Sequence, residues 1–370
     1  MDDVTAADLR EALAAVAAEA GAAFGVAAAD PFPEVAESLR ARVAAGHHGG
    51  LGFTFRDPDR AADPGRTRPW ATRLVAVAVP YVPQAEAPDH GPRIARYAAP
   101  DAYRRLADLL DRLAALLVDA GFRAEPVYDD ASLVDRAVAV RAGVGWWGRS
   151  SMVLVPGAGP WTVLGSVATD APLPTDRPTA RTCGTCTACI PACPTGAIVA
   201  DGVVDARRCL AAILQRPGVV PRWVRPLVGS RLYGCDDCLV ACPPGERPRR
   251  RETPTRPLDL VELLGTCDRD LLDRYGHLYL PGRRPRYLRR NALVVAGNLG
   301  DETLVPVVAG FLGHPDPLLR IHAAWATARL GGPIAEAALA EARRRERDRD
   351  VLAELDAPSE ASSPPAIGLP

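Results

Sequence analysis

Lysine is absent from the 370-residue sequence, so all 44 of its basic residues are arginines. Schiff-base enzymes, pyridoxal-phosphate enzymes and GxxxxGK[ST] phosphate loops all depend on a lysine ammonium group, and the absence excludes these three classes. The 44 arginines are offset by 45 acidic residues, so the chain is not a general polycation. Any nucleic-acid site must therefore be a local basic patch.

Long apolar runs and a secretory signal are also missing. No uninterrupted apolar segment approaches the roughly 18 residues that span a bilayer, and residues 1–25 have the pattern of an amphipathic helix. We therefore expect a soluble, cytoplasmic protein with no membrane partner, acting as a monomer. In a reducing compartment, clustered cysteines indicate metal binding in preference to disulfides.

Strand and helix patterns mix over residues 1–175, which predicts an α/β or α+β domain. Apolar residues at helical spacing predict packing helices over residues 9–21 and 103–121. The β-branched run at residues 73–82 predicts a buried strand. Residues 151–169 contain two apolar runs joined by a GAGP turn, and we expect them to form a β-hairpin.

The region after residue 284 is helical throughout and contains an internal repeat. Identical residues recur 31 positions apart, the pairs being Leu288 and Leu319, Arg289 and Arg320, Ala292 and Ala323, Leu299 and Leu330, and Gly300 and Gly331. This echo predicts two paired-helix repeats of HEAT type. We expect four regions in all: residues 1–175, a cysteine module at 176–250, helical repeats at 251–345, and a polar, proline-rich tail at 346–370 that we expect to be disordered.

Eight of the nine cysteines lie between residues 183 and 242, seven of them in two matching motifs. These are Cys183-x2-Cys186-x2-Cys189-x3-Cys193-Pro194 and Cys235-x2-Cys238-x3-Cys242-Pro243, with Cys209 upstream of the second. In this pattern three closely spaced thiolates hold one [4Fe-4S] cluster, and the cysteine before proline ligates the other. We therefore expect a first cluster on Cys183, Cys186, Cys189 and Cys242, and a second on Cys193, Cys209, Cys235 and Cys238. Two zinc sites are the alternative. Cys267 stands outside both sets, and we expect it to be a free, buried thiol.

Several segments around these motifs resemble the epoxyqueuosine reductase family. The resemblance covers residues 6–330 and is carried by VYDDASLVDRAVAVRAGVGWWG, ARY, RRCLAAILQRPG, RPLVGSRLYGCDDCLVACPPG and YLRRNALVVAGNLG. It implies a cobalamin-binding α/β domain, a two-cluster ferredoxin-like module and C-terminal HEAT-like repeats. It also implies a reaction on tRNA, in which cobalamin reduced through the clusters removes the epoxide oxygen of epoxyqueuosine at the wobble position. An electron donor of unknown identity is implied as a further partner.

The family's catalytic aspartate falls on Asp129, six residues before Asp135 at the acidic position of the family's LERA segment. Opening an epoxide leaves an alkoxide, and a carboxylic acid in a dry pocket could protonate it if burial raises its pKa. The alternative is that Asp129 or Asp130 caps a helix beginning near Ala131. We expect Asp129 to be the acid and Asp130 the cap.

The same resemblance implies that Asp129, Val153, Leu164 and Asp236 lie against the corrin, largely through main-chain contacts. The sequence contains no DxHxxG segment, the pattern that supplies a histidine to cobalt. Cobalamin would therefore be bound base-off, which makes the cobalt easier to reduce.

The sequence departs from the family at two places that we expect to lie near the substrate. Gly148-Arg149-Ser150 stands where the family usually reads GKN, and Ala102-Tyr103-Arg104 stands where it reads DYH. Two alternative functions therefore stay open. One is a corrinoid reductase acting on a small-molecule epoxide or halide, and the other is a non-catalytic ferredoxin-type electron carrier.

Local arginine clusters follow the second cysteine motif, open the helical repeats and lie between Cys209 and Cys235. Arginines on helical repeats beside a redox site can hold the phosphates of a tRNA stem. We expect the anticodon stem-loop to contact Arg222, Arg225, Arg286, Arg289 and Arg290; an ordinary solvated surface is the alternative.

Overall fold

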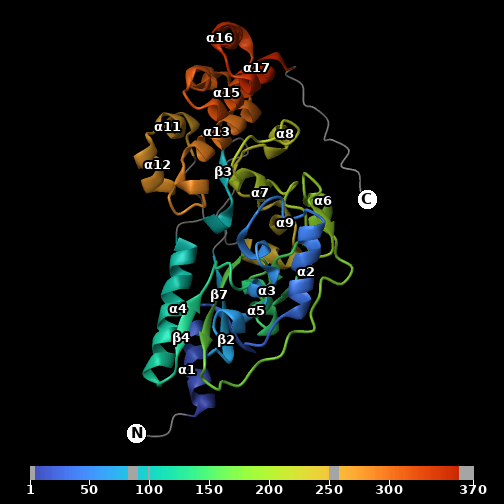
Figure 1. Cartoon of the computed structure of the whole chain (residues 1–370), viewed down its shortest axis with the longest axis vertical. Coiled ribbons are helices and arrows are strands. Elements are labelled where there is room, and N and C mark those ends of the chain that lie inside the picture. The colour runs from blue at the N-terminus through green and yellow to red at the C-terminus, as the bar shows by residue number, and fades with distance from the viewer. Residues whose placement is uncertain (1–4, 82–90, 99–100, 250–257, 358–370) are drawn as a thin grey trace. The chain divides into compact units, whose positions relative to one another are not determined.

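The computed structural model describes residues 5–81, 91–98, 101–249 and 258–357, which fall into two compact units (Figure 1). The first unit comprises Met1–Gln84, Ala99–Arg207 and Asp236–Thr253. The second comprises Ala85–Ala98, Arg208–Cys235 and Pro254–Pro370. Each unit therefore contains one part of the cysteine-bearing region.

A four-stranded antiparallel sheet forms the centre of the first unit, with the strand order β1-β2-β7-β4. Its strands are β1 (Ala23–Ala28), β2 (Arg73–Pro80), β4 (Ala124–Val127) and β7 (Thr162–Thr169). The strand predicted at residues 73–82 is confirmed as β2, whose six internal residues are all buried. Because β2 and β7 occupy the two central positions, they run as near-continuous apolar segments.

Helices cover both faces of this sheet (Figure 1). The predicted packing helices are confirmed as α1 (Ala6–Glu19) and α4 (Asp101–Asp119), which pack together on one face, and α5 (Asp135–Arg141) covers the other. Gly165 of β7 allows α4 to approach closely, since a Cβ at that position would lie 2.8 Å from Cδ1 of Leu110. The N-terminal domain is thus α+β with an antiparallel sheet.

The predicted hairpin over residues 151–169 is wrong. β6 (Val153–Leu154) pairs backward with β5 (Trp146–Trp147), and only the bridge between Val155 and Gly159 closes the GAGP turn. β7 pairs instead with β2 along eight residues and with β4. The long-range pairing buries every β7 residue except one, which a local two-stranded hairpin could not do.

Shorter elements of the first unit connect the sheet to the cysteine loops. They are α2 (Pro33–Ala44), η1 (Phe53–Phe55), α3 (Pro58–Ala61), η2 (Pro64–Arg66), α6 (Cys189–Ala192), β8 (Ile198–Ala200), β9 (Val203–Val204), α9 (Asp237–Val240) and α10 (Pro243–Arg249).

The second unit is helical apart from a short parallel pair, β3 (Arg93–Ile94) with β10 (Arg231–Tyr233). Its other elements are η3 (Arg96–Ala98), α7 (Leu210–Gln215), α8 (Arg225–Val228), α11 (Leu260–Gly265), α12 (Asp268–Tyr275), η4 (Pro281–Arg283), α13 (Arg286–Leu299), η5 (Glu302–Leu304), α14 (Val305–Gly310), η6 (Phe311–Gly313), α15 (Pro317–Leu330), α16 (Gly332–Arg345) and α17 (Arg349–Asp356). The 31-residue echo corresponds to α13 and α15, two 14-residue helices that pack against each other. Each is followed by a glycine with positive φ, Gly300 and Gly331.

The segment between Cys209 and Cys235 belongs to this second unit, although its sequence position suggested the cysteine module. Its apolar residues, including Leu214 and Val224, are buried in the same core as the repeat helices. α7, α8 and β10 each pack on α13.

The expectation of disorder from residue 346 is wrong for residues 349–356, which form α17. Val351 is buried, and the nearly buried carboxylate of Glu354 pairs with Arg225 at 2.9 Å and also with Arg222. Composition alone missed this helix because its polar residues are satisfied by partners more than 100 positions away. Residues 358–370 lie outside the described part of the chain. Across the described residues, no helix is both long and apolar enough to cross a membrane.

Candidate active site

The four cysteines assigned to the first cluster lie close together in the first unit. Burial, together with the nearby thiols of Cys183, Cys189 and Cys186, raises the pKa of the Cys242 thiol to about 11. Burial and the same neighbouring thiols also raise the pKa of Cys189. α6, which begins at Cys189, packs on α9 of the second motif. The fold thus brings the first three cysteines to the one before Pro243, 53 positions beyond Cys189 in sequence number.

The cysteines assigned to the second cluster are distributed over both units. Cys193 and Cys238 lie in the first unit, and Cys209 and Cys235 lie at the two ends of the 208–235 segment of the second. The Sγ atom of Cys193 accepts a hydrogen bond from the Ala197 amide at 3.2 Å. Such N–H···S bonds stabilise thiolate charge and tune cluster potentials.

All nine cysteines are free, in agreement with the prediction of metal ligands over disulfides. No three His, Cys, Asp or Glu side chains in the described ranges are grouped to hold a single metal ion. The donors gathered around Cys242 are all thiols, a donor set that suits an iron-sulfur cluster. Cys267 is free as expected but exposed, so the prediction that it is buried is wrong.

Trp161 connects the central sheet to the turn that follows Cys242. This fully buried indole at the start of β7 donates its Nε1–H to the Gly245 carbonyl at 2.8 Å. A Cβ on Gly245 would lie 2.7 Å from that nitrogen, so only glycine fits against the ring. This hydrogen bond therefore attaches the beginning of α10, directly after Cys242, to the sheet.

Arg149 points into the first cysteine loop, where its guanidinium donates to the Gly184 carbonyl at 2.9 Å and pairs with Asp201 at 3.2 Å. Its charge acts on the Cys189 thiol, opposing the increase in that group's pKa caused by burial. The side chain therefore contacts the cluster loop, and the expectation that this departure from the family pattern lies near the substrate stays a prediction.

Asp129 lies in the turn after β4 with a φ of +46°, a left-handed conformation uncommon for a residue other than glycine. Its backbone N–H donates to Oδ2 of Asp135 at 3.2 Å. Burial raises the pKa of the Asp129 carboxyl, and the negative charge of Asp130 raises it further. Both effects favour the protonated form that a general acid requires.

Asp135, the first residue of α5, is a functional candidate that the sequence analysis used only as a landmark. Burial raises the pKa of its carboxyl to about 8, with the charge of Asp129 adding to the effect. Its Oδ1 atom is buried and has no hydrogen-bond partner among the described residues. No sequence signal shows this, because the burial comes from the tertiary fold.

The predicted helix cap at Asp130 is wrong. α5 begins four residues later than expected, after Val134, which makes no side-chain cap bond. Asp130 instead accepts a 2.6 Å hydrogen bond from the Ser132 amide within the turn. Although burial opposes ionisation, hydrogen bonds from Ser132 and the charges of Arg68 and Arg60 hold the pKa of Asp130 below its ordinary value.

The residues expected against the corrin, Asp129, Val153, Leu164 and Asp236, all lie in the first unit. Val153 and the partly buried Leu164 belong to one apolar cluster on the α5 face of the sheet, and Val127 at the end of β4 belongs to it too. Val153 is almost completely buried. Asp236 is buried immediately before α9.

Three of the described histidines are held in local bonds within the second unit. Nε2 of His322 accepts from the Val220 amide, Nδ1 of His314 accepts from the Asp316 amide, and His277 contacts the Ala98 carbonyl. The residues expected against the corrin supply apolar side chains (Val153 and Leu164) and carboxylates (Asp129 and Asp236), and since none of them is a histidine they fit a cobalamin bound base-off.

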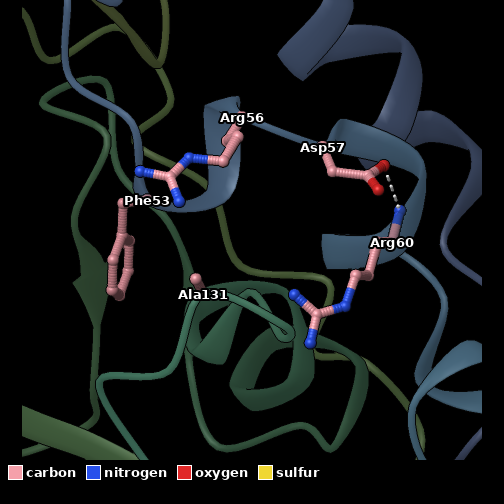
Figure 2. Close-up of a pocket in the computed structure, with 5 residues that line it drawn as sticks. All are labelled: Phe53, Arg56, Asp57, Arg60 and Ala131. Atoms are coloured by element: carbon pink, nitrogen blue, oxygen red, sulfur yellow. Dashed lines mark hydrogen bonds between the residues drawn. The ribbon is translucent and has the colours of Figure 1, made fainter.

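A pocket of about 220 Å³ opens next to the Asp129 turn and is lined by Phe53, Arg56, Asp57, Arg60 and Ala131 (Figure 2). Ala131 directly follows Asp130 in the chain. No sequence motif predicted this pocket, and the available signal was the FTFRDPDR segment at residues 53–60, in which two arginines lie near aromatic residues.

Two of the arginines proposed for tRNA contact are structural. The side chain of Arg225 is only 1% exposed, donates to the Val220 carbonyl and pairs with Glu354. Arg290, also 1% exposed, binds the carbonyls of Leu214, Arg216 and Gly218. The prediction that these two contact phosphates is therefore wrong, because neither guanidinium reaches the surface.

The other three proposed arginines form ion pairs but keep some exposure. Arg222 pairs with Glu354, Arg286 with Asp316 at 3.1 Å, and Arg289 with Asp268. Their contact with tRNA stays a prediction.

Two of the four expected regions match known families. Residues 182–245 match the 4Fe-4S double cluster binding domain, and residues 280–357 match HEAT repeats. The two-cluster module and the HEAT-type repeats predicted from sequence are thereby confirmed.

Full-length relatives extend the similarity across the chain. The epoxyqueuosine reductase of Bacillus cereus is 32% identical, the match covering 90% of this chain and 92% of the relative. That of Escherichia coli is 34% identical, with 76% of this chain and 79% of the relative covered.

Solved structures agree with these relatives. A crystal structure of epoxyqueuosine reductase with an epoxyqueuosine-modified tRNA-Tyr stem loop superimposes with a TM-score of 0.86 at 29% identity, covering 95% of this chain and 98% of that chain. A structure of the Bacillus subtilis enzyme with its catalytic aspartate loop swung out of the active site also superimposes with a TM-score of 0.86 at 29% identity, covering 95% of this chain and 98% of that chain.

Proposed function

The chain belongs to the epoxyqueuosine reductase family, and from this premise we propose that it reduces epoxyqueuosine to queuosine at the wobble position of tRNA. The observation that carries the proposal is the Asp129 turn, where a solvent-accessible carboxyl, whose pKa is raised by partial desolvation and by the charge of Asp130, lies at the position of the family's catalytic acid. We propose two [4Fe-4S] clusters and base-off cobalamin as the cofactors, with Asp129, Val153, Leu164 and Asp236 against the corrin.

The reaction removes one oxygen atom from the substrate. Two electrons and two protons convert the epoxide to an alkene and release the oxygen as water. Bound cobalamin would supply a strongly reducing centre for this step, and each cluster transfers one electron at a time. Electrons must therefore enter twice per turnover from an external donor.

The residues around Asp129 suit a proton donor. Asp129 is accessible to solvent, but partial desolvation keeps its carboxyl protonated to higher pH than an ordinary aspartate, and the ionised Asp130 beside it adds to this effect. A positioned acid of this kind contributes roughly 10²- to 10⁴-fold to a rate. Asp129 would protonate the oxygen as the first C–O bond breaks, so that an alcohol and not an alkoxide forms. A second proton, taken up from solvent directly or through Asp129, would let the oxygen leave as water when the second C–O bond breaks.

Two solved relatives support the assignment of substrate and loop. One contains an epoxyqueuosine-modified tRNA stem loop, and another shows a catalytic aspartate loop that can leave the active site. The left-handed backbone of Asp129 is consistent with a loop held in place by its surroundings. We further propose that the protein works as a monomer in the cytoplasm.

Nucleoside analysis of tRNA tests this function most directly. A strain lacking the gene should accumulate epoxyqueuosine and lose queuosine, and the wild-type gene should restore queuosine. The purified protein, reconstituted anaerobically with iron, sulfide and cobalamin, should convert epoxyqueuosine-containing tRNA when a chemical reductant is supplied. An unchanged nucleoside profile together with no conversion would refute the proposal in favour of a small-molecule substrate or an electron carrier.

A further inference from the structure

The pocket beside the Asp129 turn has an unusually exposed aromatic wall. Phe53 is 49% exposed, and its φ of +45° places a bulky residue in the left-handed region. Such a conformation is unfavourable, typically by about 1–3 kcal/mol, and persists where the surrounding structure imposes it. The fold therefore holds a large apolar ring toward solvent at the mouth of a pocket, an arrangement that favours a ligand.

The opposite walls carry positive charge. Arg56 and Arg60 are both exposed, and no described carboxylate forms a salt bridge with either guanidinium. Nearby arginines differ, since Arg40 pairs with Asp59 and Arg66 pairs with Asp63.

Asp57 also lines the pocket, but its carboxylate has another role. Its Oδ1 accepts the Arg60 backbone N–H at 3.0 Å and so caps α3. Figure 2 shows this carboxylate turned toward the Arg60 amide, whereas the Phe53 ring and the guanidinium groups of Arg56 and Arg60 border the space near Ala131. The Arg60 charge also acts on Asp130, lowering the pKa of that carboxyl.

We propose that this pocket, the Phe53 pocket, binds one unpaired nucleotide of the RNA next to the nucleotide that reaches Asp129. Its base would stack on the Phe53 ring, and its phosphate would lie between Arg56 and Arg60. Aromatic rings beside arginines are how proteins hold unstacked bases of single-stranded RNA. Because Ala131 is two residues from Asp129, a nucleotide held here would place its neighbour at the acid. This inference rests on the proposed function.

One other ligand offers the same chemistry, the nucleotide tail of cobalamin, which also combines an aromatic base with a phosphate. The open mouth and the half-exposed Phe53 favour a ligand that arrives as part of a long strand. The experiment below separates the two sources.

Binding of fluorescently labelled tRNA-Tyr anticodon stem-loop RNA, measured by anisotropy at several salt concentrations, tests the Phe53 pocket. We expect Phe53→Ala to weaken binding roughly tenfold, as loss of one stacked base does. Arg56→Gln and Arg60→Gln should each reduce the slope of log affinity against log salt by about 0.7. The control Arg66→Gln removes an arginine of the same segment that is already paired with Asp63, and should change neither quantity.

Stem-loops with an abasic site on either side of the wobble position identify the bound base. One of these abasic stem-loops should bind wild-type protein as weakly as the intact stem-loop binds Phe53→Ala. Combining that abasic stem-loop with Phe53→Ala should weaken binding no further. Additive losses, or wild-type affinity in all three pocket variants, would overturn the Phe53 pocket while leaving the proposed function intact. Failure of the wild-type protein to bind any stem-loop would refute both.

Cobalamin binding tests the other source of a base and a phosphate, the nucleotide tail of the cofactor. Titration with cobalamin and with cobinamide, which lacks the nucleotide tail, should give wild-type affinities in Phe53→Ala. If this variant loses affinity for cobalamin but not for cobinamide, the pocket holds the cofactor's tail and the RNA proposal is overturned. The substituted side chains are exposed, and unchanged thermal unfolding would confirm that the variants are folded.

Discussion

The backbone N–H of Asp129 donates a hydrogen bond to the Oδ2 oxygen of Asp135 at 3.2 Å, which connects the proposed acid to the first residue of α5. This bond supports the left-handed backbone of Asp129 and places two carboxyl groups with raised pKa values side by side. The charge of Asp129 disfavours ionisation of Asp135, and that of Asp130 disfavours ionisation of Asp129. The turn therefore favours the protonated forms of both carboxyls more than an isolated aspartate would.

Replacing the proposed acid should abolish most turnover without preventing RNA binding. We expect Asp129→Asn to reduce the rate of queuosine formation about 10²- to 10⁴-fold, since an amide cannot donate the required proton. Stem-loop affinity should stay within a few-fold of wild type. Single-turnover assays with reconstituted protein measure the first quantity, and anisotropy measures the second.

Asp130→Asn is the matched control for this change and tests the pH dependence. Wild-type activity should fall as pH rises through the pKa of Asp129, because the acid must be protonated. Since the negative charge of Asp130 raises that pKa, the variant's activity should fall at lower pH than that of wild type. A pH profile identical to wild type would contradict this electrostatic coupling.

The stability of the fold should depend on the proton held by Asp135. Its pKa is raised to about 8 in the folded protein from an ordinary value near 3.8, so its stabilising contribution is complete below pH 4 and is lost as pH rises through 8. Asp135→Asn preserves an acceptor for the Asp129 amide but does not ionise. We expect it to match wild type in unfolding free energy near pH 4 and to exceed it by on the order of 1 kcal/mol or more above pH 8. Denaturant unfolding at both pH values measures this, and a pH-independent difference would show that Asp135 keeps no proton.

Removal of Cys242 should eliminate the first cluster. Its thiol lies among those of Cys183, Cys186 and Cys189, so a serine there leaves that cluster with three thiolates. We expect Cys242→Ser to contain about half the iron of wild type after anaerobic reconstitution, with one of two paramagnetic signals missing. Cys267→Ser, which changes an exposed thiol outside both sets, should retain all of its iron. Full iron content in Cys242→Ser would contradict the crossed assignment.

Arg149 should make the first cluster easier to reduce. Its positive charge near Cys189 and its bond to the Gly184 carbonyl both stabilise added negative charge in that loop. Arg149→Gln should lower the potential of the first cluster by some tens of millivolts, where about 59 mV corresponds to a tenfold change in the one-electron equilibrium. Arg149→Lys should retain most of the potential.

Arg42→Gln is the control for Arg149, because Arg42 donates to the carbonyl of Gly202 in the same β8–β9 turn that contains Asp201. Redox titration followed by electron paramagnetic resonance distinguishes the variants. Equal shifts in Arg149→Gln and Arg42→Gln would mean that the turn's structure, and not the charge of Arg149, sets the potential.

Glu354 should be essential for the helical unit. Its carboxylate neutralises Arg225, which is almost completely buried, and breaking a buried pair typically costs about 3–5 kcal/mol. We expect Glu354→Ala to lower the thermal unfolding midpoint of the second unit markedly. Glu341→Ala, which removes an exposed partner of Arg344 and Arg345, should have little effect. Comparable midpoints for the two variants would show that α17 contributes nothing to stability.

The local patterns that succeeded all depend on residues near one another in the chain. Apolar spacing predicted α1 and α4, the β-branched run predicted β2, and the 31-residue echo predicted the HEAT-type repeats in which α13 and α15 are the corresponding helices. The predictions that failed depended on distant partners. β7 left its expected hairpin to pair with β2, and α17 formed because Glu354 meets two arginines from another segment.

The site divides in the same way. The sequence by itself determined the two-cluster module, because a CxxCxxCxxxCP motif allows few chemistries, and it predicted the cluster ligands and, by resemblance, the role of Asp129. Only the tertiary structure decided which charges are free to act. It buried Arg225 and Arg290, turned Arg149 toward the cysteine loop, and left Arg56 and Arg60 unpaired beside Phe53. Burial and charge pairing set the pKa of a carboxyl and the availability of an arginine, and both depend on neighbours that the order of residues does not specify.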